Sequence, residues 1–448
     1  MTPAPASSTT RKRWRNWAGN QECTPASVHH PASEDELASV VKEAASAGER
    51  VKVVGAGHSF TGAALTTGRQ VHLDRYDRVL NVDRATGLVT VQAGITLRRL
   101  NDELASRGLA LENLGDIAYQ SVAGALSTST HGTGARIGTL STQIRGLRLV
   151  TGDGSLVDCS AEEEPALFGP ARVGVGALGV ISTVTLQALP AFRLSAVEEP
   201  LRLDRVLDAL DDHVDGHDHF EFFWVPHTGW ALTKTNDRTD APLAPRSRWH
   251  GFRDDVLVSN VAFGALCKIG RVRPALIPRL IRALPSTGRV TYVERSDRVF
   301  ASPRFVHFYE MEYAVPREAA ASAVRSVRDW VKRSGLFLNF PVEVRFVAGD
   351  DIALSPASGR DTCYIAVHVY RGMDATQYFT AVESIMDGHG GRPHWGKLHY
   401  QTAETLAPRY PRWDDFQAAR LRVDPDGRFA NDYTDRVLGH IPQTSGQG

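Results

Sequence analysis

Three glycine-rich segments, far apart in the sequence, constrain the fold of this chain more than any other feature. The first, GAGHSFTG, starts at Gly55 and follows the apolar run VKVV. A Rossmann dinucleotide loop needs Gly-x-Gly-x-x-Gly between a strand and a helix. Here Phe60 stands at the third glycine position and His58 stands where the helix would begin. The Rossmann fingerprint therefore fails in this segment.

The second segment, GVGALG at 174–179, has the required glycine spacing. However, the β-branched run VISTVTLQ follows it and predicts a strand. A pyrophosphate in a Rossmann fold binds at a helix N-terminus, which this context does not offer. We therefore interpret the match as a spacing coincidence.

The third segment, SVAGALSTSTHGTGARIG at 121–138, consists almost entirely of small and hydroxyl residues. Its backbone N–H groups and hydroxyls can surround a pyrophosphate without a lysine. A plain loop of this length is uncommon in a compact domain, because such loops are usually functional. Together the three segments predict a nucleotide cofactor in an α+β, flavin-binding architecture other than the Rossmann fold.

Composition excludes several classes of function. Lys+Arg and Asp+Glu both number 51, so nothing indicates a nucleic-acid partner. The four cysteines are isolated, which argues against a thiolate zinc site and fits a reducing compartment. The basic N-terminus lacks an apolar signal region, and the longest apolar runs are too short to span a bilayer. We expect a cytoplasmic protein with no transmembrane segment, and peripheral membrane contact stays open.

The 448 residues suggest two or three domains. We expect a disordered N-terminus at 1–12, a first α+β domain at 13–192, a second with a large sheet at 193–415, and a C-terminal segment at 416–448 that packs back on the first. Local signals in the first domain include a capping box at Ser33 and Glu36, and hairpin turns at Thr86-Gly87 and Asp153-Gly154.

Charged residues alternate with apolar ones in FPVEVRF, which predicts a strand. Glu343 and Arg345 then share one face, either as a salt-bridged surface or as part of a site. YIAVHVY similarly places His368 and Tyr370 on one face of a strand, and GGRPHWGKLHY adds Lys397.

Two other chemistries have little support. His394 and His399 are five residues apart, and the chain contains no HExxH motif, so the histidines do not indicate zinc. The sequence also contains no G-x-S-x-G motif of a serine hydrolase.

The combination of GHSF, SVAGALSTSTHGTG, EVR and HWGK, with further matches over nearly the whole chain, carries a family resemblance. The chain resembles the FAD-dependent sugar-1,4-lactone oxidases and dehydrogenases of the gulonolactone and arabinonolactone type, in the vanillyl-alcohol-oxidase-like flavoprotein superfamily. The resemblance implies a PCMH-type FAD-binding domain at 13–192 and a substrate domain with a large antiparallel sheet. It implies FAD, bound covalently through His58 as in many members.

The implied activity is oxidation of L-gulono-, L-galactono- or D-arabinono-1,4-lactone at a secondary C–OH. A hydride passes to flavin N5, and O2 or an acceptor such as a cytochrome or dye reoxidises the flavin. The alternative is an alditol oxidase that acts on xylitol or sorbitol at C1–OH. Asp116 and Tyr370 favour the lactone group, because alditol oxidases carry serine and threonine there. Gly115 matches a position where glycine favours oxygen access. A non-catalytic flavin-binding module is the rival from a different class.

The resemblance also assigns site residues. It places Glu343, Arg345, His368 and Lys397 at catalytic positions. Arg345 and Lys397 would hold the reacting hydroxyl, Glu343 would bind substrate hydroxyls, and His368 would support them or relay a proton. Substrate contacts fall on Asp116, Glu343, Arg345 and Tyr370. The cofactor contacts are Gly55, Ala56, Gly57, His58, Ser59, Phe60, Gly115, Asp116, Ser121, Gly124, Ser127, Thr128, Thr130, His131, Gly132, Gly179, Val180, Ile181 and Lys397.

Overall fold

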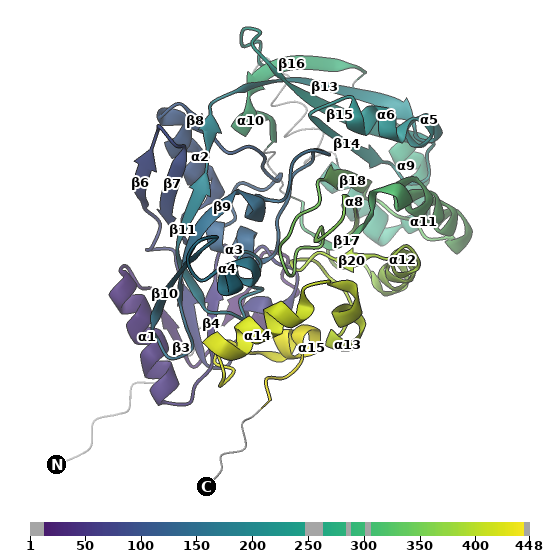
Figure 1. Cartoon of the computed structure of the whole chain (residues 1–448). Coiled ribbons are helices and arrows are strands. Elements are labelled where there is room, and N and C mark those ends of the chain that lie inside the picture. The colour runs from purple at the N-terminus through teal and green to yellow at the C-terminus, as the bar shows by residue number, and fades with distance from the viewer. Residues whose placement is uncertain (1–12, 247–262, 284–287, 301–305, 443–448) are drawn as a thin grey trace, which may run out of the picture.

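The computed structural model describes residues 13–246, 263–283, 288–300 and 306–442 (Figure 1). The N-terminus predicted to be disordered lies outside these residues. The first part of the chain forms a short hairpin and a parallel three-stranded sheet in the order β3-β5-β4. Their bounds are β1 Trp14–Arg15, β2 Glu22–Cys23, β3 Ser27–His29, β4 Val51–Val54 and β5 Arg69–His72.

Helix α1, Glu34–Ser46, connects β3 to β4. The N-cap half of the predicted capping box is confirmed, because the Ser33 hydroxyl accepts the backbone N–H of Glu36 at 3.2 Å. The reciprocal half is wrong, because the Glu36 carboxylate accepts the Ala32 N–H at 2.8 Å and not that of Ser33. Leu37, Val41 and Ala44 are fully buried on the inner face of the helix. The apolar spacing of this segment therefore led correctly to an amphipathic helix that packs on the sheet.

A five-stranded antiparallel sheet, in the order β10-β9-β11-β7-β6, stands beside the parallel one. Its strands are β6 Val79–Asp83, β7 Leu88–Gln92, β9 Ile144–Val150, β10 Leu156–Ser160 and β11 Val180–Gln187. Gly87 and Gly154 occupy the predicted turns with φ of 75° and 84°. The remaining elements are α2 Leu97–Ser106, β8 Leu109–Ala110, α3 Val122–Ser127, α4 Pro165–Ala171 and β12 Leu189–Pro190, with 3-10 turns η1 Gly62–Ala64 and η2 Leu140–Gln143.

The second part of the chain builds an eight-stranded antiparallel sheet, in the order β16-β13-β15-β14-β18-β19-β17-β20. Its strands are β13 Arg193–Arg202, β14 His219–Trp224, β15 Trp230–Thr239, β16 Val290–Arg295, β17 Phe308–Pro316, β18 Val342–Val347, β19 Thr362–Tyr370 and β20 Arg392–Pro393. The helices and 3-10 turns of this part are α5 Leu203–Asp208, α6 Leu210–Asp215, α8 Phe263–Val272, η4 Pro274–Leu276, α9 Ile277–Ala283, α10 Ser296–Phe300, η5 Arg317–Ala319, α11 Ala320–Ser334 and α12 Thr376–Gly388.

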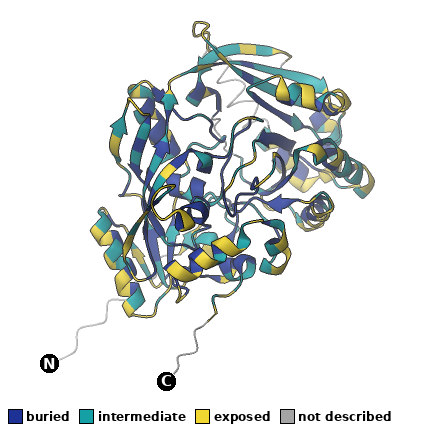
Figure 2. Ribbon diagram, in the orientation of Figure 1, coloured by how far each residue is buried: buried dark blue, intermediate teal, exposed yellow. Residues whose placement is uncertain are grey.

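Helices α5, α6, α11 and α12 cover the outer face of the large sheet (Figure 1). Val342, Val344 and Phe346 of β18 point into this apolar layer. Since side chains alternate along a strand, Glu343 and Arg345 point to the opposite face. That face is buried too (Figure 2), because loops of the first part of the chain lie against it. One such contact joins Gly134 N–H to the Phe346 carbonyl at 2.7 Å.

The C-terminal helices are α13 Ala403–Leu406, α14 Trp413–Val423 and α15 Asp432–Leu438, with the 3-10 turn η6 Ala407–Arg409. This segment, yellow in Figure 1, lies against the first part of the chain. The Val51 N–H donates to the Arg428 carbonyl at 2.8 Å, and Asn431 Nδ2 donates to the Gly62 carbonyl at 2.8 Å. Among the described residues, no helix is long and apolar enough to cross a membrane.

Candidate active site

A long cleft runs through the first part of the chain and encloses about 1110 Å³ of space between atoms, including the part open to solvent. Small residues and exposed backbone dominate its walls. The lining comprises Lys52, Val53, Val54, Gly55, Ala56, Gly57, His58, Ser59, Ala63, Ala64, Ile117, Gln120, Ser121, Ala123, Gly124, Ser127, Thr128, Val175, Gly176, Gly179, Ile181, His394, Gly396, Lys397 and Phe429. The three glycine-rich segments of the sequence thus meet at one cavity.

Glycines allow the segments that form this cleft to pack closely against one another. A Cβ atom at Gly55 would lie 2.2 Å from Ser121 Oγ, the hydroxyl that caps α3 by accepting the Gly124 N–H at 3.2 Å. Gly179 has φ of 132°, and a Cβ there would lie 2.6 Å from the Val150 carbonyl oxygen. The 174–179 segment leads into β11, as predicted, whereas the 121–138 segment is not loop throughout, because it contains α3.

His58 lies in the long cleft, beside Trp17 at 5.7 Å between ring centroids. Burial and, to a smaller extent, the Lys397 ammonium lower the pKa of His58 to about 4. The imidazole is therefore neutral near pH 7 and keeps a nitrogen lone pair.

A second cavity, the polar pocket, opens at one end of the long cleft. The two cavities share Ile117, Gln120, His394 and Lys397. The other lining residues are Gly115, Asp116, Thr130, His131, Phe308, Glu310, Glu312, Glu343, Arg345 and His368. All four predicted catalytic residues therefore converge here, from β18, β19 and the loop after β20.

Arg345 lies at the centre of a carboxylate cluster. Its Nε donates to Glu221 Oε2 at 2.7 Å, and its Nη2 contacts Asp116 Oδ1 at 2.5 Å and also Glu343 Oε1. Burial opposes the charge, but Asp116, Glu343 and Glu221 raise the pKa of Arg345 well above its ordinary value. The guanidinium is thus held rigidly as a cation.

Glu310 of β17 organises the other side of the pocket. Its carboxylate contacts Lys397 Nζ at 2.6 Å and His368 Nε2 at 3.4 Å. The other ring nitrogen of His368, Nδ1, lies 3.2 Å from the Pro341 carbonyl. Burial raises the pKa of Glu310, but Lys397 and His368 outweigh it and lower that pKa far below its ordinary value.

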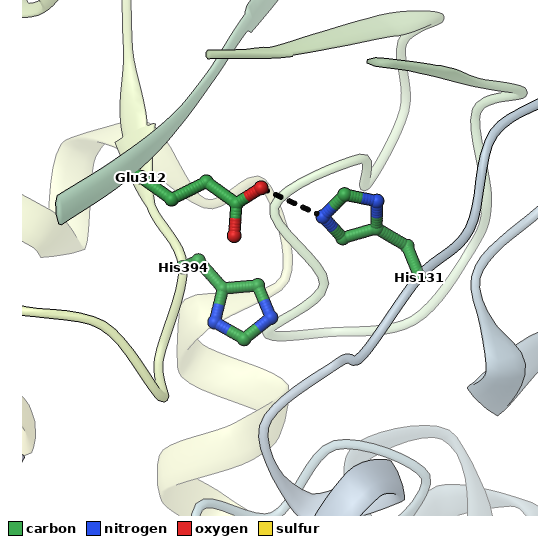
Figure 3. Close-up of side chains that lie close together, drawn as sticks. All are labelled: His131, Glu312 and His394. Carbon is green, nitrogen blue, oxygen red and sulfur yellow. Dashed lines mark hydrogen bonds and ion pairs between the residues drawn. The ribbon is translucent and has the colours of Figure 1, made fainter. Parts of the chain in front are cut away.

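His131, Glu312 and His394 form a third buried group (Figure 3). His131 Nδ1 lies 2.8 Å from the Gly132 carbonyl and Nε2 lies 3.2 Å from Glu312 Oε1. Since Nδ1 must donate to the carbonyl, the contact with Glu312 needs a second proton. Burial raises the pKa of Glu312, but His131 outweighs it and lowers that pKa to about 2.

The same three residues have the composition of a metal site, but their hydrogen bonds do not fit one. His394 Nδ1 accepts the Gly396 N–H at 3.0 Å, so the ring proton is on Nε2 and neither nitrogen is open to a metal. Glu312 and a neutral His131 would leave only two ligands, fewer than a zinc site needs. We interpret the group as a hydrogen-bonded charge cluster.

Several lining residues were absent from the sequence prediction. Glu310 and Glu312 alternate with apolar residues in FYEMEY, the pattern that revealed Glu343 and Arg345. Applying that rule to every strand would have found both. Lys52 had no comparable signal, because its ammonium reaches the Gly176 and Phe429 carbonyls at 3.1 and 2.8 Å from a distant strand.

Four predicted residues lie outside both linings. Val180 is fully buried in β11, and a Cβ at Gly132 would meet Asn113 Oδ1 at 2.3 Å. Phe60 is buried beneath Lys397, whose ammonium lies 5.3 Å from the ring centroid. Tyr370 ends β19 next to Arg271. Their assigned contacts stay predictions.

Comparison with known proteins agrees with this geometry. The model of the D-arabinono-1,4-lactone oxidase family matches residues 184–437, and that of an FAD-binding domain matches residues 25–160. L-gulono-1,4-lactone dehydrogenase of Mycobacterium tuberculosis is 50% identical over 95% of this chain and 99% of its own length. L-gulonolactone oxidase of Bos taurus is 36% identical over 95% of this chain and 98% of its own length.

Among solved structures, cholesterol oxidase of Brevibacterium sterolicum superposes with a TM-score of 0.80 and 18% identity, over 98% of this chain and 100% of its own. This likeness confirms the predicted α+β fold with its large antiparallel sheet, and the family match at residues 25–160 confirms the FAD-binding domain. The matches of sequence and fold extend over nearly the whole chain, and the protein belongs to the D-arabinono-1,4-lactone oxidase family of FAD-binding oxidoreductases.

Proposed function

We propose that this protein uses FAD to oxidise a sugar 1,4-lactone, such as L-gulono-1,4-lactone, at a secondary hydroxyl. The observation that carries the proposal is the junction of the two cavities at Lys397, where a glycine-lined cleft meets a pocket of buried charges. The relatives named above support the substrate class. Bound FAD supplies a hydride acceptor for the carbon of the alcohol.

The residues that line the long cleft fit FAD in their chemistry. Gly55, Gly124, Gly176 and Gly179 line it, so backbone can approach an extended ligand closely. The hydroxyls of Ser121 and Ser127, which also line the cleft, can donate hydrogen bonds to phosphate.

Oxidation of an alcohol also requires loss of the hydroxyl proton. Arg345 and Lys397 would hold the reacting oxygen and stabilise the negative charge that develops on it. Glu310 contacts both Lys397 and His368 and would keep the two side chains in position. We assign the relay of that proton to His368. Glu343 would bind a neighbouring substrate hydroxyl while it keeps Arg345 in place.

We further propose that His58 bonds FAD covalently. The cleft-lining position of His58 and its neutral imidazole support this. The new C–N bond would replace an N–H bond of the imidazole and a C–H bond of the flavin ring methyl group. The two electrons released would pass to the flavin, which the electron acceptor of the proposed reaction would reoxidise. Acid precipitation tests the bond directly. Yellow colour in the pellet is expected, and colour left in the supernatant would disprove it.

The central experiment is anaerobic titration of the purified yellow protein. L-gulono-1,4-lactone should bleach the flavin and xylitol should not. Bleaching by xylitol alone would favour an alditol oxidase, and bleaching by neither would favour a binding module. Reoxidation of the reduced protein by O2, cytochrome c or a dye then identifies the class of acceptor.

A further inference from the structure

The polar pocket contains more carboxylates than cationic side chains. Its lining has four carboxylates, two cationic side chains and three histidines. They are Asp116, Glu310, Glu312, Glu343, Arg345, Lys397, His131, His368 and His394. A pocket of this kind recognises hydroxyl groups readily, since carboxylates accept hydrogen bonds from them.

Both cationic side chains in this lining are already paired. Arg345 meets three carboxylates, and Lys397 meets Glu310 at 2.6 Å. Anionic substrates are usually held by an arginine fork that can form two parallel bonds with the carboxylate. Here an incoming carboxylate would have to compete with Asp116 and Glu343 for Nη2 of Arg345.

A 1,4-lactone in water has a natural competitor, since hydrolysis of the ring ester gives the open-chain aldonate. The aldonate keeps the free hydroxyls of the lactone, gains the hydroxyl released from the ester, and carries one negative charge near neutral pH. Like charges repel strongly in a buried, low-dielectric site. We propose that the carboxylates around Arg345 make the pocket select the neutral lactone against the aldonate, with Asp116 as the specificity-determining residue.

Asp116 is the member of the cluster best placed for this role. Its side chain is 16% exposed, compared with 7% for Glu221 and 7% for Glu343. It also lines the pocket from a loop rather than from the sheet, so loss of its charge need not disturb strand pairing. The inference rests on the proposed function.

The test compares the wild-type holoenzyme with Asp116→Asn at pH 7, using L-gulono-1,4-lactone and sodium L-gulonate. KM is measured for the lactone, and the inhibition constant for gulonate is checked by the flavin absorbance change. In the wild type, the gulonate constant should exceed the lactone KM by about a hundredfold or more. Asp116→Asn should lower that ratio at least about tenfold, because one repulsive charge is removed.

Glu221→Gln removes a charge behind Arg345 and should also lower the ratio, which keeps the test decisive if Asp116→Asn does not fold. Asp158→Asn, which changes an exposed acid on β10, is the matched control and should leave the ratio unchanged. Equal binding of gulonate and lactone by the wild type, or an unchanged ratio in the folded variants, would overturn the inference. If the lactone does not reduce the flavin at all, the proposed function itself fails, and this inference fails with it.

Discussion

The long cleft and the polar pocket adjoin each other but are built by opposite means. The cleft brings together backbone and small side chains from loops more than a hundred residues apart in sequence, such as Gly55 and Gly179. The pocket brings together charged side chains from several strands of one sheet, such as Arg345 of β18 and Glu310 of β17. A methyl group added at a glycine should therefore impair flavin binding in the cleft, whereas loss of a charged side chain should impair catalysis in the pocket.

Arg345→Met should give the largest effect. Loss of the guanidinium removes the main group that stabilises negative charge on the substrate, so kcat/KM should fall about a thousandfold. It also removes the cation that contacts Asp116, Glu221 and Glu343, which should cost about 3–5 kcal/mol of stability. Stopped-flow flavin reduction and thermal unfolding measure the two effects.

Arg345→Lys is the matched control, because it keeps the charge and loses the planar fork. Compared with Arg345→Met, Arg345→Lys should restore more of the thermal stability than of the rate of flavin reduction. Retention of over a tenth of wild-type turnover by Arg345→Met would contradict the role given to the pocket.

Glu312→Gln should make the free energy of unfolding depend less on pH in acid. The pKa of Glu312 is lowered from its ordinary value of 4.5 to about 2, since His131 outweighs the effect of burial. The folded carboxylate thus binds protons less readily than the unfolded one, so its contribution to stability is complete above pH 4.5 and is lost as the pH falls towards 2. That contribution is about 3 kcal/mol.

Urea unfolding at a series of pH values measures this effect. Between pH 4.5 and 2, the free energy of unfolding should fall less steeply for Glu312→Gln than for the exposed control Glu404→Gln. Equal slopes for the two variants would refute the charge cluster.

Two glycine substitutions test the cleft. Gly179→Ala forces a side chain into φ of 132° and against the Val150 carbonyl, which should cost about 1–3 kcal/mol and lower the flavin content. Gly124→Ala lies in α3, where alanine is tolerated, but its methyl group projects from a cleft-lining position. It should lose flavin without losing stability. The ratio of flavin to protein absorbance and the Tm separate the two cases, and a fully loaded Gly124→Ala would argue against FAD in this cleft.

Tyr370→Phe should give the smallest effect. The family resemblance assigns Tyr370 to the substrate, yet it lies outside the lining of the polar pocket. We therefore expect less than about a twofold change in KM for the lactone, in the range of an ordinary surface substitution. A tenfold rise would mean that the substrate site extends beyond the pocket described here.

Local patterns predicted much of the fold and part of the site. The N-cap at Ser33, the turn at Gly154 and the shared face of Glu343 and Arg345 all depend on residues a few positions apart. Glu310 and Glu312 also alternate with apolar residues along their strand, so the same local pattern indicates that they share a face. Lys52 could not have been found, since its partners lie 124 and 377 residues away.

By itself, the sequence determined which side chains share a face of each strand and where backbone can approach closely, because strand periodicity and glycine are local properties. Only the tertiary structure decided that Glu221 of β14 and Asp116 of a distant loop meet at Arg345. Strand order and loop packing set those contacts, and they depend on the folding of the whole chain. The charge state of the pocket, and with it the chemistry proposed here, follows from those long-range contacts.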